Sequence, residues 1–146
     1  MKKLIATTAL IATLISPTLL SADKADGLNV LVNSGEPQTQ AMAMVLSLMS
    51  IKKHHKKVNI VLCGLAGDLA DKNIEGVPVK RPNGKAPSAK DHLKLLIKKG
   101  AKVQVCPLYL PNAGKDKSVL LKGITVAKPP MVAGQLLNED FANVTF

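Results

Sequence analysis

The residues best suited to chemistry in this 146-residue chain are its two cysteines, Cys63 and Cys106. Each stands at the end of a short apolar run that predicts a buried β-strand. Pro107 suits the first position of a helical turn, and the free N–H groups of such a turn would favour a thiolate at Cys106. Cys106 is therefore the first candidate for a reactive residue. A free cysteine is also often a plain core residue, and for both cysteines this alternative stays open.

Two other patterns could indicate a ligand site, and neither does so strongly. His54 and His55 are adjacent, so on a helix their side chains point in different directions, and nearby lysines disfavour a cation. Gly64 and Gly67 lie in a loop that lacks the lysine and serine of a phosphate-binding loop and the spacing of a dinucleotide-binding loop. We predict no metal site and no cofactor.

Residues 1–22 have the layout of a secretory signal peptide, with a positive start, an apolar run over 4–15 and small residues before an expected cleavage after Ala22. The apolar run is short for a membrane span, which makes a retained membrane anchor the less favoured alternative. This layout predicts a periplasmic or secreted protein without a stable membrane anchor after processing. The mature chain, residues 23–146, has the length of a single domain and would meet an oxidising compartment, where cysteines can pair.

The chain is strongly basic, with a formal net charge of +10 at pH 7. A basic balance can indicate a nucleic-acid partner. Here the lysines are scattered, and aromatic residues make up only 2% of the chain, which leaves no pair of rings on which bases could stack. We therefore predict a solvated lysine surface and no nucleic-acid partner.

Five apolar runs predict β-strands, and helical patterns separate most of them. The predicted strands are 28–33, 58–63, 101–106, 124–126 and 144–146, and the predicted helices are 39–54, the segment between Ser88 and Gly100, 116–121 and 129–137. In the first helix, Met42, Val45 and Met49 recur at helical spacing and are expected to face the core, in a stripe that Ala41 and Leu48 widen. The alternation predicts an α/β fold, a flavodoxin-like three-layer sandwich around a five-stranded parallel sheet of order 2-1-3-4-5.

Ligands of such sheets bind beyond the carboxyl ends of the strands, near the point where the strand order reverses. This predicts a pocket with Cys106 as its catalytic residue, lined by Ser34, Glu36, Cys63, Pro107, Tyr109, Asn112 and Lys115. In the predicted order, one strand separates the two cysteines by about 9–10 Å, which favours two separate thiols over a disulfide. The segment 73–87, rich in proline and glycine, is expected to form a long surface loop that could shape the pocket.

Several motifs, taken in order, carry a resemblance to a known family. They are Lys80-Arg81-Pro82-Asn83-Gly84-Lys85, residues 95–103, Val105-Cys106-Pro107-Leu108-Tyr109-Leu110, Asn112-Ala113-Gly114, Leu120-Leu121-Lys122-Gly123-Ile124 and Val144-Thr145-Phe146. Together they resemble the DsrE/DsrF-like proteins of the DsrEFH superfamily. The resemblance extends over essentially the whole mature chain.

The resemblance implies a flavodoxin-like domain that assembles into trimers or hexamers and carries sulfur as a persulfide on a cysteine after its third strand. Cys106 stands at that position. Exported relatives often have a second cysteine three residues later, where this chain has Tyr109. An arginine often follows the cysteine in sulfur carriers, and here the segment 112–115 stands in its place.

The function that follows is an exported protein that handles sulfur through one reactive cysteine, as a persulfide carrier or part of a relay. It would be a sulfur-transfer protein rather than a turnover enzyme, with a sulfur donor or acceptor protein as its partner. Two alternatives remain. One is a non-catalytic oligomeric module of the same fold that binds a small ligand. The other is a cysteine redox sensor, which would need Cys63 within reach of Cys106.

Overall fold

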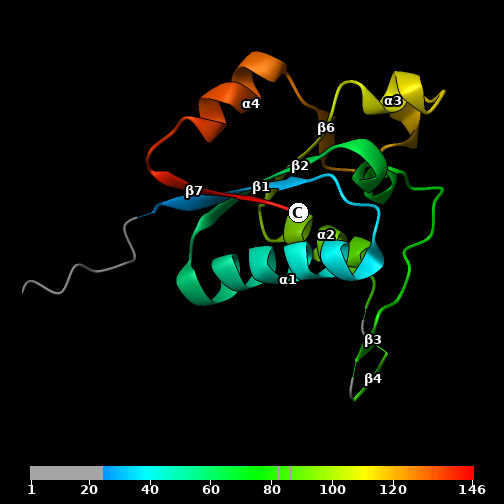
Figure 1. The fold of residues 1–146 in the computed structure, drawn as a ribbon, viewed down its shortest axis with the longest axis horizontal. Helices are drawn as coiled ribbons and strands as arrows, with labels where there is room; N and C mark the ends of the chain where they lie inside the picture. The colour runs from blue at the N-terminus through cyan, green and yellow to red at the C-terminus, as the bar shows by residue number, and fades with distance from the viewer. Residues whose placement is uncertain (1–24, 82, 86) are drawn as a thin grey trace, which may run out of the picture.

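The computed structural model of this chain describes residues 25–146 apart from 82 and 86, so the predicted signal peptide lies outside the described residues. Five parallel strands form one sheet between two layers of helices (Figure 1). The strands are β1 (Gly27–Val32), β2 (Lys57–Leu62), β5 (Lys102–Val105), β6 (Ile124–Val126) and β7 (Phe141–Thr145). The predicted fold class, an α/β fold with a five-stranded parallel sheet, is confirmed.

Helices α1 and α2 cover one face of the sheet, and α3 and α4 lie on the other side (Figure 1). The helices are α1 (Pro37–His54), α2 (Ala89–Lys98), α3 (Tyr109–Asn112) and α4 (Pro129–Leu136), with the 3₁₀-helices η1 (Gly64–Ala70) and η2 (Lys117–Val119). The predicted loop 73–87 contains a small hairpin, β3 (Lys80–Arg81) with β4 (Gly84–Lys85), which extends away from the body of the molecule. No helix among residues 25–146, as far as they are described, is long and apolar enough to cross a membrane.

The order of the strands is β6-β5-β2-β1-β7, or 4-3-2-1-5 in the numbering of the predicted strands. It differs from 2-1-3-4-5 because β5 pairs with β2 instead of β1, and β7 pairs with β1 instead of β6. The crossovers through α1 and α2 run in the same direction across the sheet, so both helices lie on one face, where they pack against each other. The order therefore reverses between β1 and β7, away from Cys106.

The inner face of α1 agrees only in part with the predicted stripe. Ala41 and Leu48 are buried as predicted, and Met44 is buried as well. Met42, which was predicted to face the core, is 53% exposed. Because α1 carries apolar residues on more than one side, the helical spacing of these residues is compatible with two different buried faces. Small residues at the buried positions, such as Ala41, allow the helix to approach the sheet closely.

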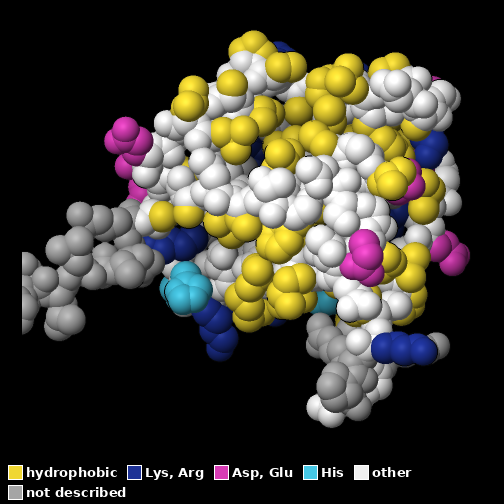
Figure 2. Space-filling model, in the orientation of Figure 1, with side chains coloured by type: hydrophobic (Ala, Val, Ile, Leu, Met, Phe, Trp, Pro, Cys, Tyr) yellow, Lys and Arg dark blue, Asp and Glu magenta, His cyan; other side chains and the backbone are white. Residues whose placement is uncertain are grey.

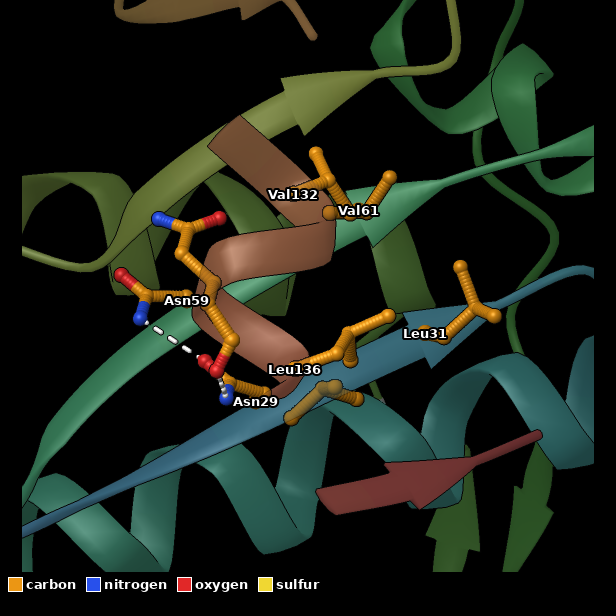
Figure 3. Close-up of a pocket in the computed structure, with 8 residues that line it drawn as sticks. Asn29, Leu31, Asn59, Val61, Val132 and Leu136 are labelled. Carbon is orange, nitrogen blue, oxygen red and sulfur yellow. Dashed lines mark hydrogen bonds between the residues drawn. The ribbon is translucent and has the colours of Figure 1, made fainter. Parts of the chain in front are cut away.

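A row of asparagines joins α4 to the other face of the sheet, and Figure 3 shows two of them, Asn29 and Asn59. Asn59, Asn29 and Asn143 lie side by side on three neighbouring strands. The Asn59 Nδ2 donates to Asn29 Oδ1, and Asn29 Nδ2 donates to Asn143 Oδ1, each at 2.9 Å. Asn29 Nδ2 also donates to the carbonyl of Gln135 (2.6 Å), and Asn143 Nδ2 to that of Leu136 (2.7 Å). These carbonyls belong to the last turn of α4, where the carbonyl of Gln135 also accepts from the N–H of Asn138 at 3.3 Å. The row of asparagines therefore helps to cap the helix.

Candidate functional site

Cys106 follows β5 directly and is partly exposed. Its N–H donates to the carbonyl of Leu62 at 2.8 Å, and its carbonyl accepts from the N–H of Tyr109 at 3.0 Å. The second bond closes a turn through Pro107 and Leu108, and α3 begins only at Tyr109, with Leu108 as its N-cap. The helix therefore begins later than predicted, and Cys106 is not its cap. The start of α3 therefore does not lie at Cys106, where it was expected to stabilise a thiolate.

An open groove of about 540 Å³ lies beside Cys106. It is lined by Gly64, Leu65, Asp68, Cys106, Leu108, Tyr109, Asn112 and Ala113. Leu65 and Leu108 are 70% and 67% exposed, so the groove is largely apolar. Its lining residues include one carboxylate, that of Asp68, and no lysine or arginine. Among the described residues, no group of three or more His, Cys, Asp or Glu side chains could hold a metal ion.

The structure brings Cys63 close to Cys106. β2 and β5 are neighbours, and their register pairs Leu62 with Val105, so the two cysteines are the next residues on adjacent strands. Burial, and to a lesser degree the neighbouring thiol of Cys106, raise the pKa of Cys63 to about 11. The expectation of one intervening strand was wrong because it depended on the predicted strand order. Both cysteines are free thiols here.

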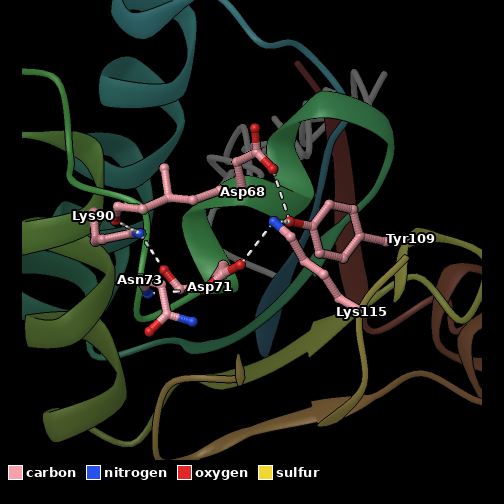
Figure 4. Close-up of polar contacts among 7 residues, drawn as sticks. Asp68, Asp71, Asn73, Lys90, Tyr109 and Lys115 are labelled. Carbon is pink, nitrogen blue, oxygen red and sulfur yellow. Dashed lines mark hydrogen bonds and ion pairs between the residues drawn. The ribbon is translucent and has the colours of Figure 1, made fainter. Parts of the chain in front are cut away.

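Tyr109 lines the groove, and Figure 4 shows its hydroxyl among the polar contacts with Asp68 and Lys115. Its hydroxyl donates to Asp68 Oδ1 at 2.7 Å and accepts from Lys115 Nζ at 3.3 Å. Burial and the bond to Asp68 raise the pKa of Tyr109, against the opposing effect of Lys115. The ring lies so close to Gly67 that a Cβ there would be 2.1 Å from a ring carbon. Tyr109 thus holds η1 against α3.

Next to Tyr109 lies a cluster of charged side chains, two of which are buried (Figure 4). Asp71 and Lys90 are only 1% and 3% exposed. Lys115 Nζ forms an ion pair with Asp71 Oδ2 at 2.7 Å, and Lys90 Nζ donates to the carbonyls of Asp71 and Ile74. Burial would raise the pKa of Asp71, but hydrogen bonds from Lys115 and from the N–H of Asn73, with the charge of Lys90, lower it overall. Burial lowers the pKa of Lys90.

Of this cluster, the sequence prediction named Lys115 but missed Asp71 and Lys90. One signal was present, because Lys90 lies three residues before the buried Leu93 and so on the inner face of α2. No comparable signal marked Asp71, which lies in a loop.

The other predicted site residues lie outside the lining of the groove. Glu36 caps α1, since its carboxylate accepts from the N–H groups of Gln38 (2.9 Å) and Thr39 (2.6 Å). The hydroxyl of Ser34 accepts from the N–H of Glu36 at 3.1 Å. Pro107 and Lys115 line a neighbouring hollow of about 570 Å³. Of the predicted residues, the groove therefore brings together Cys106, Tyr109 and Asn112, with Cys63 close to Cys106.

No protein-family model matches the chain, and no curated protein matches it significantly. Two solved structures share its fold. A protein of unknown function, MTH1491 from Methanobacterium thermoautotrophicum, matches with a TM-score of 0.60 and 14% identity, over 83% of this chain and 100% of its own. The ychN protein from E. coli matches with a TM-score of 0.58 and 18% identity, over 82% of this chain and 99% of its own. At these identities the likeness shows a common fold.

Proposed function

We propose that this chain is an exported DsrE/DsrF-like protein that carries sulfur on the thiol of Cys106. The observation behind this proposal is the partly exposed Cys106 at the wall of an open groove, beyond the carboxyl end of a parallel strand. The fold shared with two solved structures is consistent with the family, and the motif resemblance adds the position of the cysteine. Export depends on the predicted signal peptide, and so does a periplasmic or secreted location.

The transfer needs no cofactor and no outside oxidant or reductant. The Cys106 thiolate attacks the outer sulfur of a donor persulfide, R–S–SH. The S–S bond of the donor breaks, R–S⁻ leaves, and Cys106 becomes a persulfide that keeps the proton. An acceptor thiolate then attacks the outer sulfur of this persulfide, which returns Cys106 as a thiolate.

The lining of the groove favours some donors over others. Asp68 contributes negative charge, and the other lining residues contribute no positive side chain to balance a dianion such as thiosulfate. The exposed Leu65 and Leu108 suit an apolar group. We therefore expect an alkyl persulfide or the persulfide of a partner protein to be a faster donor than thiosulfate.

Mass spectrometry of the reduced mature protein tests the proposal. It is incubated with cysteine persulfide, polysulfide or thiosulfate, followed by intact mass and peptide mapping. A single added sulfur should map to Cys106, Cys106→Ser should not acquire it, and the matched Cys63→Ser variant should. Slow, equal labelling of both thiols in the wild-type protein, or no labelling by any donor, would rule out the carrier.

The apolar groove also suits a second candidate function, a non-catalytic module that binds a small ligand. Leu65 and Leu108 are 70% and 67% exposed, and a mostly apolar groove with a few polar groups is typical of small-molecule sites. In that case the thiol would be incidental. Cys106→Ser would then keep its ligand affinity, and the wild-type protein would acquire no sulfur in the experiment above.

A further inference from the structure

Cys63 and Cys106 occupy equivalent positions on two neighbouring strands. The register of β2 and β5 ends at the pair Leu62 and Val105, and each cysteine is the next residue. The N–H of Cys106 donates to the carbonyl of Leu62 at 2.8 Å, so the ends of β2 and β5 are still hydrogen-bonded beside the two cysteines. Adjacent strands lie about 4.8 Å apart, within the Cα separation of about 4.4–6.8 Å that a disulfide accepts.

The two side chains also leave the sheet on the same side. Leu62 and Val105 are fully buried in the core that α1 and α2 cover. Side chains alternate along a strand, so the next residue on each strand points to the opposite face. Cys63 keeps an extended backbone, with φ −121° and ψ 163°, and so continues this alternation. Both thiols therefore face the side of the sheet on which the groove lies.

We propose that Cys63 and Cys106 form a reversible disulfide across the ends of β2 and β5, closed by exchange with the disulfide of a small thiol compound or of a partner protein. This activity goes beyond sulfur carriage and requires no persulfide. Its substrates are disulfides and dithiols.

Each step of the exchange balances. The Cys106 thiolate attacks one sulfur of R–S–S–R, whose S–S bond breaks as R–S⁻ leaves. The Cys63 thiolate then attacks Sγ of Cys106, the mixed disulfide breaks, and a second R–S⁻ leaves. The protein dithiol is oxidised by two electrons, R–S–S–R is reduced by two, and the released thiolates take up the two thiol protons.

The environments of the two thiols assign these roles. Cys106 lines the open groove, where a disulfide can approach it. Cys63 is not among the residues that line this groove, and burial raises its pKa to about 11. Because the thiolate is the attacking form, Cys63 is the poorer first nucleophile at neutral pH. Once Cys106 carries a leaving group, however, the thiol of Cys63 is already beside it.

The aromatic disulfide 5,5′-dithiobis(2-nitrobenzoic acid) is the probe for this proposal, because each exchange step releases one coloured thiolate. The reduced mature wild-type protein should release two equivalents per chain and keep no added mass. Cys63→Ser should release one equivalent and keep a stable mixed disulfide on Cys106. Cys106→Ser should release its single equivalent at least about tenfold more slowly than Cys63→Ser, because burial raises the pKa of Cys63.

A wild-type protein that keeps one or two aromatic groups per chain would overturn the proposal, because its thiols would then react independently. The mass of the wild-type protein alone decides this point, so the result stands even if a serine variant fails to fold. The two proposals can fail independently of each other. If Cys106 acquires sulfur but no Cys63–Cys106 disulfide forms, only the sulfur-carrier proposal stands. If the disulfide forms but Cys106 acquires no sulfur, only the disulfide proposal stands.

Discussion

Asp71 is the residue on which the polar contacts of the charged cluster converge. Its carboxylate pairs with Lys115 and accepts from the N–H of Asn73 at 2.8 Å, and its carbonyl accepts from Lys90. Through Lys115 the carboxylate is connected to the hydroxyl of Tyr109 and so to the wall of the groove. A buried carboxylate with these partners is stable only in its charged form.

Asp71→Asn should reduce the free energy of unfolding at pH 7 by about 2 kcal/mol, since the change weakens hydrogen bonds to a buried charge. The pKa of Asp71 is lowered in the folded protein. A carboxylate whose pKa is lowered by folding contributes its full stabilisation above its pKa in the unfolded chain, about 3.9. This stabilisation is lost as the pH falls through its pKa in the folded protein. The difference between wild type and variant should therefore be constant from pH 7 to about 5 and narrow below about 4.

Urea unfolding at pH 7, 5 and 3 measures this difference. Glu139→Gln removes the same charge from an exposed position and is the matched control, expected to change stability by less than about 0.5 kcal/mol at pH 7. An Asp71→Asn difference that is as large at pH 3 as at pH 7 would contradict the assignment.

Residue types and spacing were sufficient to place Cys106 at the carboxyl edge of the sheet, because that is where a residue directly after a buried parallel strand lies. They were not sufficient for the partners of Tyr109. Its hydrogen bond to Asp68 spans 41 residues of sequence. Such a contact depends on how η1 and α3 pack, which the hydrophobic pattern of either segment does not contain.

At the scale of elements, α4 depends on polar contacts more than on burial. None of its residues is buried, and its last turn is held by the side chains of Asn29 and Asn143. Asn29 is itself buried and bonds to both neighbouring strands. The row of asparagines is therefore the main polar attachment of this helix to the sheet.

Asn29→Ala should reduce the free energy of unfolding by about 2 kcal/mol, because it removes the three hydrogen bonds that a buried amide makes to Asn59, Asn143 and the carbonyl of Gln135. Amide hydrogen exchange in α4 should also become faster than elsewhere in the protein. Urea unfolding and exchange mass spectrometry measure the two effects. Asn33→Ala, at an exposed asparagine just beyond β1, is the control and should change neither measurement by much. Equal acceleration throughout the chain would mean that the row does not specifically hold α4.

The alternation of apolar runs and helical patterns predicted the α/β class and most of the elements, because periodicity reports which side of an element is buried. Periodicity does not report which strands become neighbours. The strand order depends on whether α1 and α2 pack on the same face of the sheet. The observed order makes β2 and β5 neighbours, so Cys63 and Cys106 lie closer together than predicted.

At the scale of the whole molecule, apolar side chains remain on the surface over α4 and α3 (Figure 2). Met131 and Leu137, in and just after α4, are exposed, Leu137 to 81%. Leu65 and Leu108 add to the apolar surface at the groove. We propose that copies of this chain meet at the surface of α4, because association there would bury these apolar side chains.

Leu137→Lys should weaken self-association about 30-fold, because burying a leucine side chain contributes about 2 kcal/mol. Size-exclusion chromatography with light scattering over a range of concentrations measures the change. Leu46→Lys replaces an exposed leucine on α1, on the other side of the sheet, and should leave the assembly intact. A wild-type protein that is monomeric at all concentrations, or equal effects of both variants, would exclude an interface at α4.

The placement of Tyr109 has one further consequence. The chain contains one tyrosine and no tryptophan. Its ultraviolet emission therefore comes almost entirely from one ring, in the wall of the groove that Cys106 also lines and bonded to the carboxylate of Asp68. Entry of a ligand, a change at the thiol or movement of η1 would alter the surroundings of that ring. The unmodified protein thus has a built-in optical reporter at its candidate site.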